Sequence, residues 1–263
     1  PPHKLAWNIP DRVERYYALF GKAALLAAWA HSGRLGEQLE EVFAPSASAL
    51  LSSLEAMDES DFQELWEASG VRQLMLQAWS ALLPADVATP TYITRLRGEA
   101  LDVARSLPAI RAYLISAGCD YTSVFCPEVS LEDAFFWRDD HDALDCGLFD
   151  FRTVKMGHVC ECFAGLHLAP ADMRIAHTSG FVRLFTDVAA EHGGPALDAA
   201  EVLLQLALYD MVRILEDILY SARATYMKLE PGVWEHISSR EDPALTAGTR
   251  ASLELRRGLA AFV

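Results

Sequence analysis

The sequence predicts a mainly α-helical protein with one short β-hairpin around residues 134–151. Apolar residues recur at helical spacing over most of the chain, whereas no segment before residue 126 shows the alternation typical of a strand. Two short apolar segments, 134–137 and 147–151, flank the polar turn 138–142. This arrangement is typical of a hairpin, so we expect helices to form the rest of the fold.

The N-terminal half of the chain predicts a series of helices. Asp11 is a suitable N-cap for a helix that buries Tyr16 and Phe20, and Gly33 and Gly36 end that helix. The other helices expected before the hairpin are 45–57, 60–68, 71–83 and 93–117.

Breaks between the helices are marked by glycine and proline. Gly70 separates two of them, Pro84 ends the next, and residues 85–92 form a loop. Pro108 predicts a kink or a break in the helix 93–117.

Helices also follow the hairpin. Residues 156–168 are apolar almost throughout and predict a buried helix, 170–192 predict an amphipathic helix, and 197–228 predict the longest helix of the chain. The clearest turn between the last two is Gly193-Gly194-Pro195.

Three carboxylates around the predicted hairpin have the order of a phosphoryl-transfer site. Glu128 and Asp133 precede the first strand, and Asp150 lies near the end of the second. A phosphotransferase needs a catalytic carboxylate beside the acceptor hydroxyl, together with an amide or carboxylate and an aspartate on its magnesium ions. Glu128 is therefore the candidate base, and Asp133 and Asp150 are the candidate magnesium ligands.

The same segment resembles the catalytic region of the aminoglycoside phosphotransferase and choline-kinase-like family. Cys126-Pro127-Glu128 stands where that family has His-Gly-Asp, Asp133 stands at the position of its Asn, and Asp150 matches its metal-binding Asp. Residues 156–198 resemble the helical half of the family's fold, and 16–36 resemble the first long helix of the same lobe. The resemblance implies a kinase-like helical C-terminal lobe.

Of the positions compared, only Asp150 is unchanged, and the substitutions at the others weaken catalysis. Glu128 shifts the carboxylate by about an ångström, and an error of that size can reduce the rate roughly 100-fold. Pro127 fixes φ and removes a backbone donor, and Cys126 cannot make the hydrogen bonds of histidine. Because Asp133 can still hold a hard cation, metal binding is better supported than catalysis.

The family also binds ATP against a β-rich N-terminal lobe, which we do not expect in this chain. That lobe supplies a lysine on a strand and a glycine-rich cover over the phosphates. The sequence before residue 126 has neither, and none of the chain's lysines lies in a strand-like context; they are Lys4, Lys22, Lys155 and Lys228. The resemblance thus implies half of a nucleotide site.

Composition predicts a single acidic, soluble domain. The chain has 263 residues and no linker rich in proline, glycine or serine, so we divide one domain into a helical N-terminal segment, residues 1–118, the degenerate catalytic loop and hairpin, 119–155, and the C-terminal helices, 156–263. A formal charge of −15, from 22 basic and 37 acidic residues, argues against nucleic acid and anionic membranes as partners. No apolar run approaches the roughly 20 residues of a bilayer span, although peripheral association with a membrane complex stays open.

The first residue is Pro rather than Met, so we expect a trimmed chain from which a targeting peptide or a β-rich lobe has been removed. The five cysteines include no CxxC pair and indicate buried thiols in a reducing compartment, cytoplasm or an organelle such as a plastid or mitochondrion. Cys160 and Cys162 lie near His158 and Glu161, but their spacing fits no common zinc motif.

Other acidic groups favour solvated surfaces over sites. The run Asp139-Asp140-His141-Asp142 has Ala143 where the last aspartate of a DDxxD diphosphate site would stand, so we interpret it as a solvated turn. Glu201, Asp210 and their acidic neighbours are expected to form a charged helix face, and His158 and His167 to be satisfied core or interface residues.

Three functions remain open. The preferred hypothesis is a catalytically impaired phosphotransferase, a pseudokinase, that acts as a binding or scaffold subunit without a cofactor. The alternative is an active small-molecule phosphotransferase that uses Glu128, Asp133 and Asp150 with magnesium and ATP. The third is an accessory subunit of a large assembly, with exposed aromatic residues at a partner surface; the candidates are Trp7, Trp66, Trp79 and Trp234.

Overall fold

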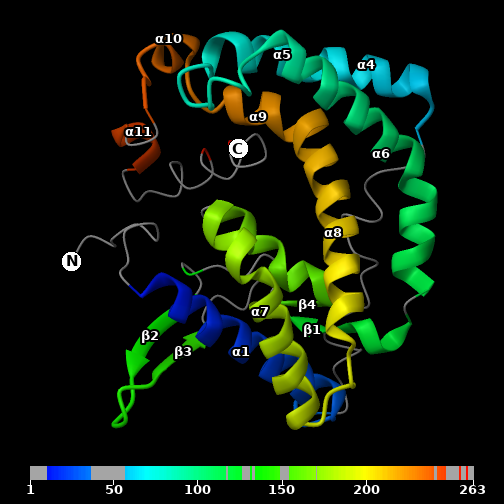
Figure 1. Ribbon diagram of the computed structural model, residues 1–263, viewed down its shortest axis with the longest axis vertical. Helices are drawn as coiled ribbons and strands as arrows, with labels where there is room; N and C mark the ends of the chain where they lie inside the picture. The colour runs from blue at the N-terminus through cyan, green and yellow to red at the C-terminus, as the bar shows by residue number, and fades with distance from the viewer. Residues whose placement is uncertain are drawn as a thin grey trace. The chain divides into compact units, whose positions relative to one another are not determined.

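The protein is mainly α-helical, as the sequence predicted, and its described residues include two small antiparallel sheets of two strands each (Figure 1). The structure is a computed structural model of the 263-residue chain. It describes residues 11–36, 57–116, 118–125, 131, 134–148, 154–169, 171–239, 242–246, 255 and 259. The helix predicted over 45–57 lies almost wholly outside these residues. None of the described helices is both long and apolar enough to cross a membrane.

The chain forms two compact units. One comprises residues 1–5, 53–111 and 211–263, and the other comprises 6–52 and 112–210. We call them the 53–111 unit and the α1 unit. The boundaries fall inside two helices, α6 (Pro90–Ser116) and α8 (Ala199–Glu216). The single-domain interpretation stays a prediction.

The α1 unit is built on a pair of long helices, α1 (Arg12–His31) and α7 (Ala171–Glu191), which contact each other along their length (Figure 1). Asp11 occupies the N-cap position of α1, as predicted, and its carboxylate bonds to Arg15 rather than to a backbone amide. Gly33 follows the helix with φ 74°, a conformation that favours glycine. The core of the unit contains the large side chains of Tyr16, Leu19, Phe20, Phe163, Phe181 and Phe185.

The predicted buried helix 156–168 is correct only in part, because its first three residues are in a strand and the rest form a 3₁₀ helix instead of an α-helix. Its first residues belong to strand β4 (Lys155–His158), which pairs with β1 (Thr122–Phe125), and the rest form a 3₁₀ helix, Val159–Leu168. The segment is largely buried, so its apolar run does not reveal which secondary structure it adopts. Lys155 is therefore in a strand, contrary to the sequence interpretation, but its ammonium pairs with Glu161 at 2.6 Å.

The hairpin exists, with its second strand shifted. Strand β2 (Ala134–Arg138) pairs with β3 (Leu144–Leu148), so β3 begins three residues before the predicted start. Residues 149–151 lie outside the described residues. Figure 1 shows the hairpin beside the N-terminal half of α1, which contacts β3.

The turn after α7 is at the predicted glycines and leaves no space for a side chain. A Cβ added to Gly194 would lie 2.8 Å from the carbonyl oxygen of Ala189 and 3.3 Å from the Cα of Ala28. Because both neighbours are backbone atoms, they cannot rotate away. We expect Gly194→Ala to lower the free energy of unfolding by about 2 kcal/mol, measured by urea denaturation. Gly98→Ala is the matched control, because a Cβ there meets no atom; an equal effect of the two changes would contradict the packing argument.

The 53–111 unit contains α4 (Glu59–Ser69), α5 (Val71–Gln73), a π-helical turn (Leu74–Ala78) and most of α6. Asp58 caps α4 and receives hydrogen bonds from the amides of Ser60 and Asp61, so the helix begins slightly before the predicted residue. Gly70 ends it with φ 65°. The helix α6 continues through Pro108 without the break that the sequence had allowed.

The same unit also holds the C-terminal helices. The predicted helix 197–228 is a continuous helical run that consists of α8, a π-helical segment (Asp217–Ser221) and α9 (Ala222–Tyr226). Its C-terminal end belongs to this unit. Two short helices follow, α10 (Pro231–Trp234) and α11 (Pro243–Thr246).

Candidate functional site

The predicted catalytic and metal-binding carboxylates lie outside the described residues. This holds for Glu128, Asp133 and Asp150, and also for Cys126 and Pro127. Their geometry is therefore not included in the site, and their roles stay predictions. The structure does describe the hairpin that these carboxylates flank in sequence.

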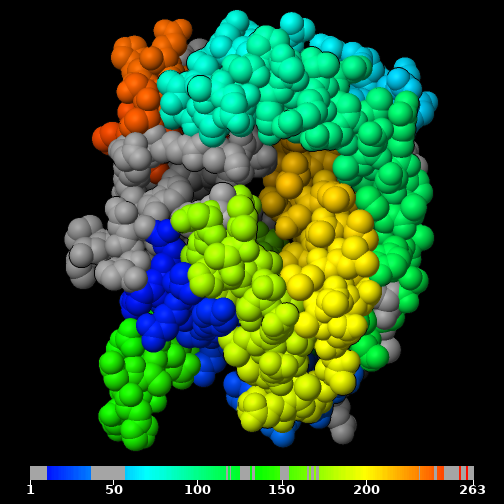
Figure 2. Space-filling model, viewed as in Figure 1, coloured from blue at the N-terminus to red at the C-terminus, as the bar shows by residue number. Residues whose placement is uncertain are grey.

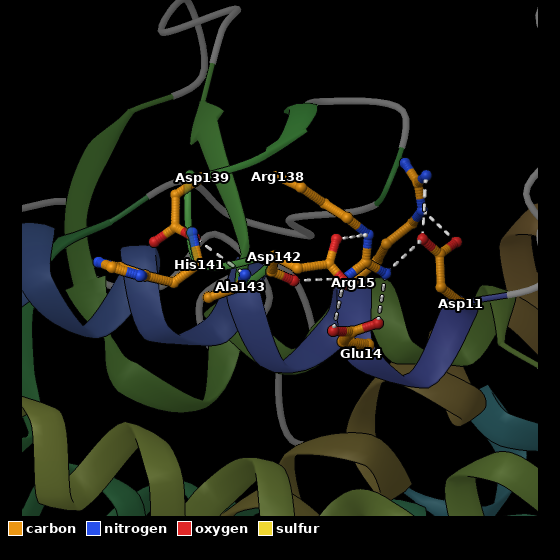
Figure 3. Close-up of polar contacts among 8 residues, drawn as sticks. All are labelled: Asp11, Glu14, Arg15, Arg138, Asp139, His141, Asp142 and Ala143. Carbon is orange, nitrogen blue, oxygen red and sulfur yellow. Dashed lines mark hydrogen bonds and ion pairs between the residues drawn. The ribbon is translucent and has the colours of Figure 1, made fainter.

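The turn of the hairpin is closed by an aspartate. The Asp139 carboxylate accepts hydrogen bonds from the amides of His141 at 2.8 Å and Ala143 at 2.9 Å (Figure 3). Asp142 takes φ 62°, a left-handed conformation that aspartate tolerates better than most residues. Since residues 139–143 are all exposed, the acidic run is a solvated turn, as the sequence predicted.

Arg138 at the end of β2 ties the hairpin to the first turn of α1. Its guanidinium lies 2.9 Å from Glu14 and 3.5 Å from Asp11, and it donates to the Asp142 carbonyl at 2.8 Å (Figure 3). The hydrogen bond with Glu14 raises the pKa of Arg138. Arg15 donates to Asp11 at 2.8 Å, which lowers the pKa of that carboxyl. These contacts connect the end of β2 to the N-terminal turn of α1.

The inner face of the hairpin is packed against the core. Cys146 is buried, and desolvation raises the pKa of its thiol to about 11, so it is not a reactive thiolate at neutral pH. The Arg15 guanidinium lies 4.7 Å from the centroid of the Phe136 ring. At the side of the hairpin, Lys22 of α1 pairs with Asp145 of β3 at 3.0 Å. Both strands are thus attached to α1.

The outer face carries two exposed aromatic rings. Phe135 and Trp137 alternate with Phe136 along β2, are 55% and 41% exposed, and stack with their centroids 5.3 Å apart. The Phe135 ring lies across Gly147, its partner on β3, where any Cβ would meet ring atoms. Because Gly147 has no side chain, the Phe135 ring can pack directly on the backbone of β3.

The aromatic residues that the sequence proposed for a partner surface are a different set, and that prediction is wrong for three of them. Trp66, Trp79 and Trp234 are only 4%, 0% and 1% exposed, and Trp7 lies outside the described residues. Trp79 packs edge-on against Trp234 with centroids 6.0 Å apart, so both belong to the core of the 53–111 unit.

A buried histidine, His158, lies at the end of the β1–β4 sheet and beside Gln205 of α8. His158 is the last residue of β4 and the N-cap of the 3₁₀ helix, and its Nδ1 accepts a hydrogen bond from the amide of Cys160 at 3.2 Å. Its ring is nearly parallel to that of Tyr121, with centroids 6.4 Å apart. Burial lowers the pKa of His158 to about 4, and the amide of Gln205 partly opposes the fall. The imidazole is therefore neutral at physiological pH.

The polar side chains beside His158 form a series of contacts that runs along α8 to Tyr113. Within the described residues, neither His158 Nε2 nor Gln205 Oε1 makes a hydrogen bond of normal geometry, although both are buried. Gln205 donates to Glu201 at 2.6 Å, and Glu201 accepts from the Tyr113 hydroxyl at 2.8 Å, which raises the pKa of Tyr113. Glu201 is thus a half-buried hydrogen-bond acceptor rather than a member of a purely solvated face.

Two cysteines lie close to His158 in the 3₁₀ helix. Cys160 and Cys162 are buried free thiols, and desolvation raises the pKa of Cys160. Within the described ranges, no three His, Cys, Asp or Glu side chains are grouped in a way that could hold a metal ion. The buried-thiol interpretation of these two residues is confirmed.

Each unit contains an open cavity. The cavity in the α1 unit has a volume of about 280 Å³ and lies between the 3₁₀ helix, α7 and α8; its lining includes Phe163, Arg174, Ile175, Thr178, Leu206 and Asp210. The cavity in the 53–111 unit, about 200 Å³, is lined partly by Gly70, Gln73, Gln77 and Arg223. Both are below the roughly 300 Å³ at which small-molecule sites begin.

No family model, curated protein or solved structure matches this chain. The hairpin and the buried His158 group are therefore interpreted from their own geometry.

Proposed function

We propose that this chain is a non-enzymatic binding or scaffold subunit of a larger protein assembly, derived from a phosphotransferase of the aminoglycoside and choline-kinase-like family. The observation that carries the proposal is the outer face of the hairpin. Two large aromatic rings stack in solvent on β2, and the other side chains of this strand contact α1 through Arg138 with Glu14 and through Phe136 with Arg15. Exposed aromatic residues of this kind provide much of the affinity at protein interfaces.

The attachment of the hairpin to α1 supports a binding role. An isolated two-stranded hairpin is marginally stable in water, but this one is fixed by Arg138 to Glu14 and by Asp145 to Lys22. Since the rings are held before a partner arrives, less conformational entropy is lost on binding.

The sequence supports a loss of catalysis. Glu128 misplaces the candidate base, and Pro127 and Cys126 remove backbone and side-chain donors that the family's catalytic loop contains. Such a chain would keep the helical half of the fold, and its function would be to bind other proteins through its surface.

Nucleotide binding gives the first test. We expect no magnesium-dependent change in Tm with millimolar ATP and no phosphate transfer to kanamycin or choline. A working site at 100 times its Kd would stabilise the protein by about 2.7 kcal/mol, which a thermal-shift assay detects easily. A Tm rise that is abolished by Asp150→Ala and kept in the control Asp86→Ala, together with transfer activity, would establish the enzyme alternative instead.

Particle size gives the second test. When the purified 29.0 kDa chain is added to a native extract of the source cells, it is expected to elute from a size-exclusion column at an apparent mass well above that of its monomer. Elution of all of it as a monomer would contradict a scaffold role.

A further inference from the structure

The outer face of the hairpin combines an aromatic surface with an excess of negative charge. Figure 2 shows the hairpin as a green projection beside the blue helix α1, with open space around its tip. The rings of Phe135 and Trp137 stack on β2, and the exposed turn that follows this strand carries Asp139, Asp140 and Asp142.

Among the residues that the structure describes, the basic side chains that contact the hairpin do not offset this charge. Arg138 is bound to Glu14, Arg15 to Asp11, and Lys22 to Asp145; these three cations are therefore matched by three carboxylates, and the three aspartates of the turn remain in excess. Asp142 lies 3.7 Å from Arg138 but shares that guanidinium with Glu14. The tip is consequently anionic at neutral pH.

We propose that this face binds an arginine-containing basic segment of a partner protein. A guanidinium stacks on aromatic faces and is attracted by the carboxylates of the turn, whereas an ammonium stacks less well because it is more strongly hydrated. The aliphatic portion of an arginine side chain would cover the apolar surface of Trp137. The inference rests on the proposed scaffold function, for which it names the partner chemistry.

The charge also decides against other occupants. A nucleic acid or an anionic membrane would be repelled by the aspartates of the tip. A second copy of this chain would bring the same carboxylates and the same net charge of −15 to the interface. A cationic segment is the partner that gains from both features of the surface.

The test uses the full chain and fluorescein-labelled decapeptides of alternating residues. Arg–Leu is the probe, Lys–Leu tests the guanidinium, and Glu–Leu tests the sign of the charge. Fluorescence anisotropy is expected to show saturable binding of Arg–Leu, weaker binding of Lys–Leu and no binding of Glu–Leu. Affinity should fall as salt rises from about 50 to about 300 mM, because the Debye length shortens.

Substitutions in the hairpin test whether the Arg–Leu peptide binds at its outer face. The double change Phe135→Ala and Trp137→Ala is expected to weaken Arg–Leu binding at least about tenfold, the effect of losing an interface anchor. Trp29→Ala is the matched control, since Trp29 is an exposed tryptophan of α1 with 37% exposure. Asp140→Lys should weaken binding several-fold, and Asp86→Lys, an equal change of charge on the other unit, should leave it within about twofold.

Three results would overturn the inference. They are equal binding by the double variant and the parent chain, equal affinity for Glu–Leu, and a self-associated species in analytical ultracentrifugation that the double variant abolishes. This outcome is separable from failure of the proposed function: ATP-dependent stabilisation and phosphate transfer would refute the scaffold role whatever the peptides do, and a failure of the peptides alone would leave the scaffold role without this partner.

Discussion

Phe20→Ala is expected to lower the free energy of unfolding of the α1 unit by about 4 kcal/mol, the usual range for Phe→Ala in a core being about 3–5 kcal/mol. Phe20 is 0% exposed and stacks on Phe163 with centroids 4.7 Å apart. It also contacts the rings of Phe181 at 5.4 Å and Tyr16 at 6.0 Å. The change would remove the ring that joins α1, α7 and the 3₁₀ helix.

Urea denaturation followed by circular dichroism measures this loss. Phe20→Leu keeps most of the apolar volume and should cost less than about 1.5 kcal/mol. Trp29→Ala is the control on the same helix, because that ring is partly exposed, and its effect should stay below about 1 kcal/mol. If Phe20→Ala cost no more than Trp29→Ala, the aromatic cluster would not be the stabilising core of this unit.

Local signals in the sequence were sufficient for most of the helices. The α1 helix has Asp11 before it and Gly33 after it, and its apolar residues recur every three or four positions, so both its extent and its buried face could be predicted. The turn at Gly193 and Gly194 was equally clear. These features depend on residues close together in the chain.

Features that depend on distant residues could not be predicted in this way. Strand β4 forms because Lys155–His158 pairs with β1, which lies far earlier in the chain. The apolar run itself contains no signal that indicates this pairing. Trp79 is buried by Trp234, which is far away in the sequence. Its burial follows from a tertiary contact, so tryptophan composition alone did not indicate it.

The candidate site shows both situations. The hairpin was predictable from two apolar segments and a polar turn, but three consecutive aromatic residues, Phe135, Phe136 and Trp137, give no alternation of polarity. Which face is buried is decided by contact of Ala134 and Cys146 with the core cluster. The outer aromatic pair therefore became visible only with the packing of the hairpin on α1.

Acid is expected to destabilise the α1 unit through His158. The pKa of this histidine is about 4 in the folded protein against 6.5 for the unperturbed side chain. As pH falls, the unfolded chain takes up the proton first, so the stabilisation is present above pH 6.5 and is lost as pH approaches 4. At about 1.4 kcal/mol per pKa unit, the histidine alone should account for about 2 kcal/mol between about pH 7 and pH 4.5.

His158→Asn separates this effect from that of the carboxylates. The asparagine Oδ1 can still accept the hydrogen bond from the Cys160 amide, because asparagine is a good N-cap, but it does not titrate. At neutral pH the variant should be less stable than the parent, since it lacks the ring that packs on Tyr121. Toward the acid end of the range the difference should shrink or reverse, because only the parent must bury a titrating group. His141→Asn, at an exposed position of the hairpin turn, is the control for the exchange of histidine for asparagine itself. Parallel curves for His158→Asn and the parent would mean that His158 is solvated or protonated in the folded state, contrary to its position between Tyr121 and Gln205.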